Sequence, residues 1–380
     1  MLLLTVLLLL FGSLILPTFT YYLWMKNKQR LVWGLTRSEE YRPKVSLVVA
    51  TYNEVSVIRR KLENIKTLDY PEDKLQVLVV DSNSADGTLD VCRNFLANEK
   101  FPFQIRLISE NDRLGKSHAL NTALDYAEGE IIATSDADSF WEGDALRNAT
   151  SFFADPSVGA VTGREKLLNL EKSIHTMSEG IYRDFYYTLR LGESKIHSTL
   201  IFQGELSLYR RSAFDRFEDR PGYSDDTGTV ISIVSSGYRC IFVPDALFSD
   251  TAAYSLSGRL MLKSRRAQHL IAGVIQSIRF KINGKLCLPW LIVFFNFYLH
   301  ILSPLILFLT LFVSAVAFIV YFQLVWFLPL LVIVALGFKK LRIFAVSYLT
   351  SNVALIMGLV YHLTKKRSTY WRKIEEMRTE

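Results

Sequence analysis

Cysteine is scarce in this sequence, with only Cys92, Cys240 and Cys287 in a chain of 380 residues. They are widely spaced, so they form neither the paired spacing of a zinc site nor a framework of disulfide bonds. This scarcity argues against a disulfide-stabilised secreted fold and indicates thiols that are kept in a reducing compartment. Internal repeats and low-complexity tracts are also absent from the sequence.

Charged side chains are absent from three long stretches: Met1 to Met25, Leu286 to Phe338 (53 residues) and Ile343 to Thr364 (22 residues). About 20 apolar residues suffice for a helix to cross a membrane. We therefore expect an N-terminal anchor over 1–25 and C-terminal transmembrane helices within 286–364. A cleaved signal peptide is the alternative for the first stretch, but a basic start and a small-residue cleavage site are missing. For the C-terminal region, both two and three crossings remain open, and we favour three.

Basic residues flank the apolar stretches. Lys26, Lys28 and Arg30 follow the first one directly, so the positive-inside tendency places about 27–285 in the cytoplasm. We expect a multi-pass protein of the cell membrane with a basic tail over 365–380. The net charge of +7 is explained by anionic lipid headgroups rather than by nucleic acid, because much of the excess lies beside the apolar stretches.

Short apolar runs alternate with helical patterns in the region between the apolar stretches. The predicted strands are 45–50, 75–80, 103–108 and 130–134. This alternation predicts an α/β domain over 27–255, with a mixed, mostly parallel sheet and helices on both faces. Because polar clusters follow three of these strands, we expect them to line one edge of the sheet.

Two carboxylates stand one residue apart in the stretch SDADSF, at the end of the fourth strand. Asp136 and Asp138 offer the oxygen ligands that Mg²⁺ or Mn²⁺ accepts, together with phosphates and water. A turn with helix-capping acids is the structural alternative, because Asp is common in both.

Four motifs occur in a fixed order: VVATYNE from Val48, VVDSNSADGT from Val79, GKSHALN from Gly115, and SDAD from Ser135. In this order and spacing, residues of about 44–270 resemble the family 2 glycosyltransferases of the GT-A fold. The resemblance implies a membrane-bound hexosyltransferase similar to the polysaccharide and glycolipid synthases.

The resemblance also implies a nucleotide-sugar site, built from Thr51, Tyr52, Glu54, Asp81, Lys116 and Asp136. Tyr52 and Glu54 would flank the base, Asp81 would accept from it, and Lys116 would lie near the diphosphate. Asp136 and Asp138 would bind the metal, which stabilises the leaving diphosphate as a Lewis acid. We expect a UDP-sugar rather than a GDP-sugar, although Ser82 stands where relatives often carry an acid. A strand-end turn is the alternative for Asp81, and a solvated loop lysine for Lys116.

A second acidic pair, Asp225 and Asp226, lies in the stretch GYSDDT at the start of a predicted helix that ends at Gly237. The stretch resembles the family motif whose last acid is the catalytic base, a position that Asp226 matches. Capping of the helix is the alternative, because Asp is a favoured N-cap. Since a phosphate acceptor needs no base, the motif favours a hydroxyl acceptor over a bare polyprenyl phosphate.

The stretch LKSRRAQH from Leu262 resembles a degenerate QxxRW motif in which Arg265 takes the place of the motif's arginine and Arg266 that of its tryptophan. We expect both to belong to the nucleotide-sugar site, with Arg265 on the donor diphosphate, since a guanidinium suits phosphate oxygens; binding to lipid headgroups is the alternative for Arg265. The pattern over 256–285 predicts an amphipathic helix that lies on the membrane, with Lys263 and Arg279 on lipid headgroups. Gln203 and Gly204 are the candidate acceptor-binding residues.

Together these features predict an inverting, metal-dependent glycosyltransferase. It would move a sugar from a nucleotide sugar to a hydroxyl of a membrane lipid or lipid-linked saccharide. A processive polysaccharide synthase with a secretion channel is the first alternative, followed by a polyprenyl-phosphate glycosyltransferase. A non-catalytic membrane scaffold is the least favoured, because both acidic pairs are present.

Overall fold

The computed structural model describes residues 2–321, 334 and 336–364. Its described part contains one eight-stranded sheet in the order β3-β2-β1-β4-β7-β6-β8-β5. The strands are β1 Val45–Thr51, β2 Leu75–Asp81, β3 Gln104–Ser109, β4 Ile131–Asp136, β5 Phe140–Trp141, β6 Val158–Leu167, β7 Ser207–Arg210 and β8 Arg239–Asp250.

The four predicted strands correspond to β1 to β4, and they pair in parallel. Thr51 lies opposite Asp81, and Ala50 lies opposite Asp136, so the carboxyl ends of β1, β2 and β4 meet at one edge. This confirms the mixed, mostly parallel sheet and places three of the polar clusters together. The antiparallel partners of β7, which are β4 and β6, make the sheet mixed.

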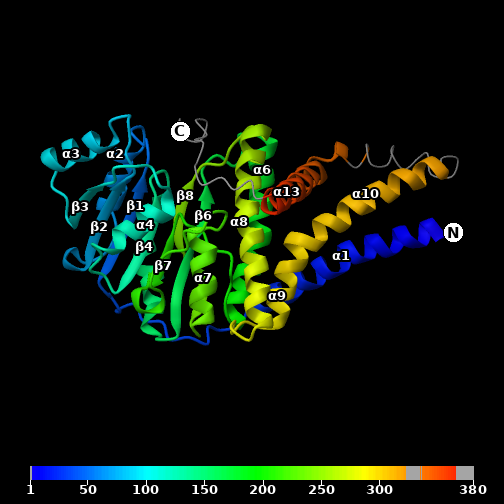
Figure 1. The fold of residues 1–380 in the computed structure, drawn as a ribbon, viewed down its shortest axis with the longest axis horizontal. Coiled ribbons are helices and arrows are strands. Elements are labelled where there is room, and N and C mark those ends of the chain that lie inside the picture. Colours follow the sequence, from blue (N-terminus) through cyan, green and yellow to red (C-terminus); the bar gives the residue numbers. More distant parts are fainter. Residues whose placement is uncertain (1, 322–333, 335, 365–380) are drawn as a thin grey trace.

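Helices cover both faces of the sheet (Figure 1). On one face, α2 Ile58–Lys66 and α3 Thr88–Asn98 pack against alternate residues of β1 and β2, and α5 Ala145–Thr150 packs against β6 and β8. On the other face, α4 Lys116–Leu124 packs against the remaining residues of β1 and β2, and α7 Asp225–Ser235 packs against β6 and β8. Short 3-10 helices occur at Glu72–Lys74, Ser151–Ala154 and Arg211–Ala213.

Two long helices, α6 Ile174–Ile196 and α8 Leu256–Ile282, stand between the sheet and the apolar helices (Figure 1). Among the described residues, three helical stretches are long and apolar enough to cross a membrane: α1 Leu2–Lys28, Trp290–Val320 and α13 Lys339–Leu363. The second consists of α9 Trp290–Phe297, a π-helical turn over Tyr298–Leu302 and α10 Ser303–Val320. The predicted basic tail and most of the segment that decides between two and three C-terminal crossings lie outside the described residues.

A buried carboxylate joins the N-terminal helix to the rest of the protein. Glu193 of α6 accepts hydrogen bonds from Tyr21 Oη of α1 (2.6 Å), Thr199 Oγ1 (2.7 Å) and Asn296 Nδ2 of α9 (3.2 Å). Next to it, a Cβ on Gly192 would lie 2.7 Å from the Met25 carbonyl oxygen. The apolar helices are therefore packed directly against α6.

Helix α8 forms where the amphipathic helix is predicted, but its apolar stripe is covered by protein. Ile271 and Val274 are buried in a cluster with Leu355 of α13. Lys263 is 12% exposed and pairs with Glu179 of α6 (3.1 Å), so its predicted role on lipid headgroups is wrong. The error is physical: an amphipathic pattern predicts that one face is covered, and here protein rather than lipid covers it.

Candidate active site

A cavity of about 480 Å³ lies between the edge of the sheet and helices α6, α8 and α13. Asp136 at the end of β4 lines it, and so do Asp225 and Asp226 in the first turn of α7. The two acidic motifs, which are almost 90 positions apart in the sequence, therefore face one cavity. A single bound molecule can contact both.

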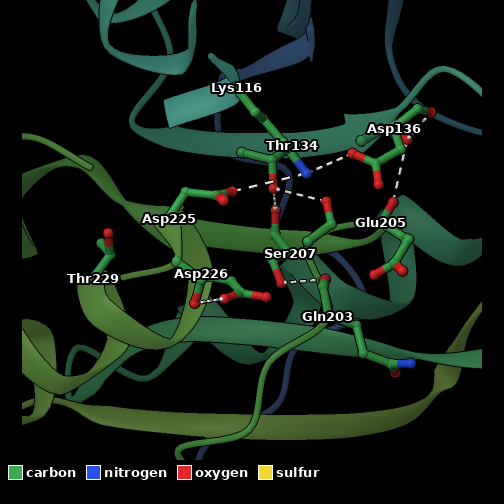
Figure 2. Close-up of polar contacts among 12 residues, drawn as sticks. Lys116, Thr134, Asp136, Gln203, Glu205, Ser207, Asp225, Asp226 and Thr229 are labelled. Carbon is green, nitrogen blue, oxygen red and sulfur yellow. Dashed lines mark hydrogen bonds and ion pairs between the residues drawn. The ribbon is translucent and has the colours of Figure 1, made fainter. Parts of the chain in front are cut away.

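Lys116 connects the two acidic motifs (Figure 2). Its Nζ lies 2.5 Å from Asp136 Oδ1 and 3.8 Å from Asp225 Oδ2. Lys116 begins α4, and the preceding Gly115 has a φ of +103°, which a glycine adopts without strain. Lys116 also restricts which residue can stand at position 204, because a Cβ on Gly204 would lie 2.9 Å from Lys116 Nζ. The ammonium is thus held between two carboxylates in the wall of the cavity.

The pKa of the Asp136 carboxyl is below its usual value. Burial acts to raise this pKa, but the charge and the hydrogen bond of Lys116 outweigh burial and lower it. Asp136 is therefore ionised at neutral pH, the state that a divalent cation needs in a ligand. Burial, and after it the charge of Asp138, raises the pKa of Asp250 to about 8. Asp136 ends β4 and Asp138 lies in the turn that follows, and carboxylate oxygens of this kind are ligands that Mg²⁺ or Mn²⁺ accepts.

The second acidic pair is half-buried in the first turn of α7. Asp226 accepts hydrogen bonds from Ser224 Oγ and from the Thr227 amide (2.5 Å). Ser224 occupies the N-cap position of α7. Neither Asp225 nor Asp226 is therefore the N-cap residue that the capping alternative proposed. Burial raises the pKa of both Asp225 and Asp226, with Lys116 opposing the shift. A raised pKa brings a carboxylate closer to the basicity that proton abstraction requires.

Four of the residues predicted to bind the nucleotide lie at or just after the ends of β1 and β2. Thr51 Oγ1 donates to Asp81 Oδ1 (3.1 Å), which also accepts from Ser84 Oγ (2.5 Å). The Arg113 guanidinium lies 3.8 Å from the centre of the Tyr52 ring. Glu54 is buried, and its backbone amide donates to Thr88 Oγ1 (2.8 Å). These residues share the sheet edge with Asp136 but do not line the cavity itself.

Arg265, Arg266, Gln203 and Gly204 all line the cavity. Arg266 forms an ion pair with Glu205 (2.9 Å between Nη2 and Oε1), and burial lowers the pKa of Arg265 to about 10. The Gln203 amide is engaged on both sides, accepting from Arg190 (2.7 Å) and donating to Glu165 (2.8 Å). The structure thus brings the degenerate QxxRW arginines to the same cavity as both acidic motifs.

Sequence reasoning missed several residues next to the site. Lys61 of α2 is 1% exposed and donates to Ser135 Oγ (2.6 Å) and the Ser139 carbonyl (2.5 Å), which bracket the Asp136/Asp138 pair. Burial lowers the pKa of Lys61 to about 7, although the charges of Asp136 and Asp138 act to raise it. Only the helical spacing of the α2 pattern, which places Lys61 on its buried side, could have singled it out. Glu205 directly follows Gly204, a candidate acceptor-binding residue, so its position in the sequence could have indicated it.

Comparison with known proteins places these motifs in a family. Residues 46–217 match glycosyl transferase family 2. The chain is 31% identical over 211 residues to YdaM, a probable glycosyltransferase of Bacillus subtilis. The aligned region covers 54% of this chain and 50% of YdaM. It is 35% identical over 143 residues to a beta-monoglucosyldiacylglycerol synthase of Synechocystis. This aligned region covers 36% of this chain and 29% of the synthase. The chain thus spans half or less of the length of these relatives.

A solved structure matches over a greater length. The mannosyltransferase of Pyrobaculum calidifontis, in complex with GDP-mannose and Mn²⁺, has a TM-score of 0.83 and 33% identity. The match covers 96% of this chain and all of that one. The motifs, the sheet and these similarities agree: the chain belongs to glycosyl transferase family 2, has the GT-A fold and is a glycosyltransferase.

Proposed function

We propose that the protein is a membrane-anchored, metal-dependent, inverting glycosyltransferase. It transfers a sugar from a nucleotide sugar to a hydroxyl of a membrane lipid or lipid-linked saccharide. One observation supports this above the others: Asp136 and Asp226 line the same cavity, and that cavity extends to α13, a helix apolar enough to enter a membrane.

Donor binding rests on the sheet edge and on the cations of the cavity. Asp136 and Asp138 hold the divalent ion, and Asp81 and Tyr52 lie where the base binds. When bound, the ion supplies Lewis-acid stabilisation of the charge that develops on the diphosphate. Lys116 and Arg265 line the cavity, and their positive charges complement the negative charge of the donor diphosphate. The solved relative is in complex with GDP-mannose, so GDP-sugars are tested beside the UDP-sugars that we expect from the sequence.

Acceptor activation rests on Asp226. Its carboxylate takes the proton of the acceptor hydroxyl as the oxygen attacks the anomeric carbon, while the bond from that carbon to the diphosphate breaks. Attack from the face opposite the leaving group inverts the configuration. Ser224 and the Thr227 amide orient the carboxylate for this step. Gln203 and Gly204 form the neighbouring wall of the cavity and are assigned to the acceptor.

A donor screen tests this function. Purified full-length protein with Mn²⁺ is incubated with UDP- or GDP-sugars and a membrane lipid extract, and the products are analysed by mass spectrometry. We expect single sugar additions to lipid, and Asp226→Asn should lower kcat by about 100- to 10,000-fold, because general-base assistance is lost. Asp215→Asn, on an exposed side chain, is the matched control and should keep wild-type turnover.

The alternatives predict other products. Long polymers would indicate a processive polysaccharide synthase, and a sugar joined directly to polyprenyl phosphate would indicate the polyprenyl-phosphate reaction. Unchanged turnover in Asp226→Asn would remove the assigned base. The absence of any sugar transfer by the wild-type protein, with all donors and lipids, would contradict the proposed function.

A further inference from the structure

A cluster of charged residues on and around α6 and α8 lies beside the cavity. Glu179 forms ion pairs with Arg183 (3.3 Å), Arg259 (2.9 Å) and Lys263 (3.1 Å), and Arg183 also contacts Glu165. Glu205 is paired with Arg266, and Asp250 lies next to Glu165 and Glu205. With Arg190 of α6 next to Arg183, five cations meet four carboxylates. The cluster therefore has one cation in excess.

Arg190 is the cation of this cluster that forms no ion pair among the described residues, and the charges of Glu205 and Glu193 act on it only from a greater distance. It is 5% exposed and lines the cavity, and its guanidinium donates one hydrogen bond, to the neutral Gln203 amide, while it lies over the Phe242 ring. Its buried Nε has no hydrogen-bond partner, and within the described residues no carboxylate forms an ion pair with it. A guanidinium has five N–H donors, and burying its charge without a counter-ion is unfavourable. The missing partner is an anion.

The cavity beside Arg190 is also partly apolar. Ile201, Leu270 of α8, and Ala354 and Leu355 of α13 line it. Helix α13 lies directly against α8 here, because a Cβ on Gly358 would be 2.7 Å from the Gln268 amide nitrogen. These residues and Arg190 line the same cavity, so a ligand that fills it meets both a guanidinium and a hydrocarbon surface.

We infer that the acceptor is a phosphate-bearing lipid, whose phosphate binds Arg190 and whose hydrocarbon lies against Ala354 and Leu355. This rests on the proposed function and narrows its acceptor to an anionic amphiphile. The phosphate is a binding group and not the nucleophile: a separate hydroxyl of the same molecule reaches Asp226. Nucleotide sugars have no hydrocarbon chain, so the apolar lining favours the lipid as the source of the phosphate.

Lipid binding to the full-length protein in a neutral detergent tests the inference. Dioctanoyl phosphatidylglycerol is compared with dioctanoylglycerol, which has the same chains without the phosphate, and with inorganic phosphate. The wild type should bind the phospholipid about 10- to 100-fold more tightly than the neutral lipid, since hydrogen bonds to a charged group are lost with the latter. Arg190→Gln should abolish this preference, and Arg190→Lys should keep part of it.

Arg93→Gln, on an exposed residue of α3, is the control and should retain the full preference. Thermal unfolding of each variant shows whether lost binding reflects lost structure. Equal binding of both lipids by the wild type would overturn the inference, and so would binding of inorganic phosphate as tight as that of the phospholipid. If Arg190→Gln weakens GDP or UDP binding as much as lipid binding, Arg190 belongs to the donor site and the inference fails.

Product analysis separates this inference from the proposed function. A glycolipid without phosphate, formed by the wild type in an Asp226-dependent reaction, would contradict the inference and leave the proposed function intact. No glycolipid at all would contradict the proposed function.

Discussion

The acidic residues of the cavity have opposite electrostatic environments. Lys116 keeps the pKa of Asp136 low, whereas burial raises the pKa of Asp225 and Asp226. Carboxyls with pKa values pushed apart are suited to different tasks, such as metal binding and proton abstraction. The assignment of roles therefore follows from which carboxylate the ammonium lies closest to.

The raised pKa of Asp226 predicts a pH dependence. The base acts in its ionised form, so kcat/KM should fall as the pH drops through this pKa, at a pH above the usual aspartate value of 3.8. The hydrogen bond from Ser224 lowers the pKa of Asp226, so Ser224→Ala should move the acidic limb of the kcat/KM profile to higher pH.

Ser232→Ala, on the exposed side of the same helix, should leave the profile of wild type unchanged. A Ser224→Ala profile that coincides with wild type, or that moves to lower pH, would show that Asp226 does not control the limb.

At the scale of elements, α13 completes the cavity by packing closely on α8. Gly358 permits this approach, because a Cβ there would lie 2.7 to 2.8 Å from backbone and side-chain atoms of Gln268 and Ala267. Backbone atoms cannot move aside as a flexible side chain can. The two helices must therefore separate if position 358 carries a larger residue.

Gly358→Ala should consequently destabilise the protein by about 1 to 3 kcal/mol, the usual range for overpacking. Thermal unfolding in detergent measures this effect. Gly337→Ala is the control, since no atom of the described residues lies within 4 Å of a Cβ there, and it should not destabilise the protein because alanine is favoured over glycine in a helix. An unfolding temperature of Gly358→Ala equal to that of Gly337→Ala would contradict the close packing of α13 on α8.

At the scale of the molecule, the catalytic domain and the apolar helices form a connected structure. Glu193 links α1, α6 and α9, and α13 lies against α6 and α8. Figure 1 shows α1 and α10 extending away from the sheet, on the far side of α6 and α8. The cavity lies between the sheet edge and α6, α8 and α13, the last of which is long and apolar enough to cross a membrane.

Cys287 offers a test of orientation. It lies between α8 and α9 and is exposed, whereas Cys92 and Cys240 are buried and burial raises the pKa of both thiols, that of Cys92 to about 12. A membrane-impermeant maleimide should label Cys287 in inside-out vesicles and not in intact cells, because the catalytic domain is expected in the cytoplasm.

Cys287→Ser should remove this labelling. Labelling of Cys287 in intact cells would contradict the cytoplasmic orientation that Lys26, Lys28 and Arg30 predict.

The sequence by itself determined the four parallel strands, the acidic motifs at their ends and the apolar helices. Strand periodicity, the order of short motifs and the lack of charge are local properties, readable within a few to about 20 residues. The helix α8 was likewise predicted, but not what covers it.

Tertiary structure alone decided that Asp136 and Asp226 share a cavity, that Lys116 lies between Asp136 and Asp225, and that α13 covers the stripe on α8. It also left the buried Nε of Arg190 without a hydrogen-bond partner among the described residues. These features join segments tens to hundreds of residues apart. Local patterns carry no information on such contacts, because distance and burial arise only when the chain has folded.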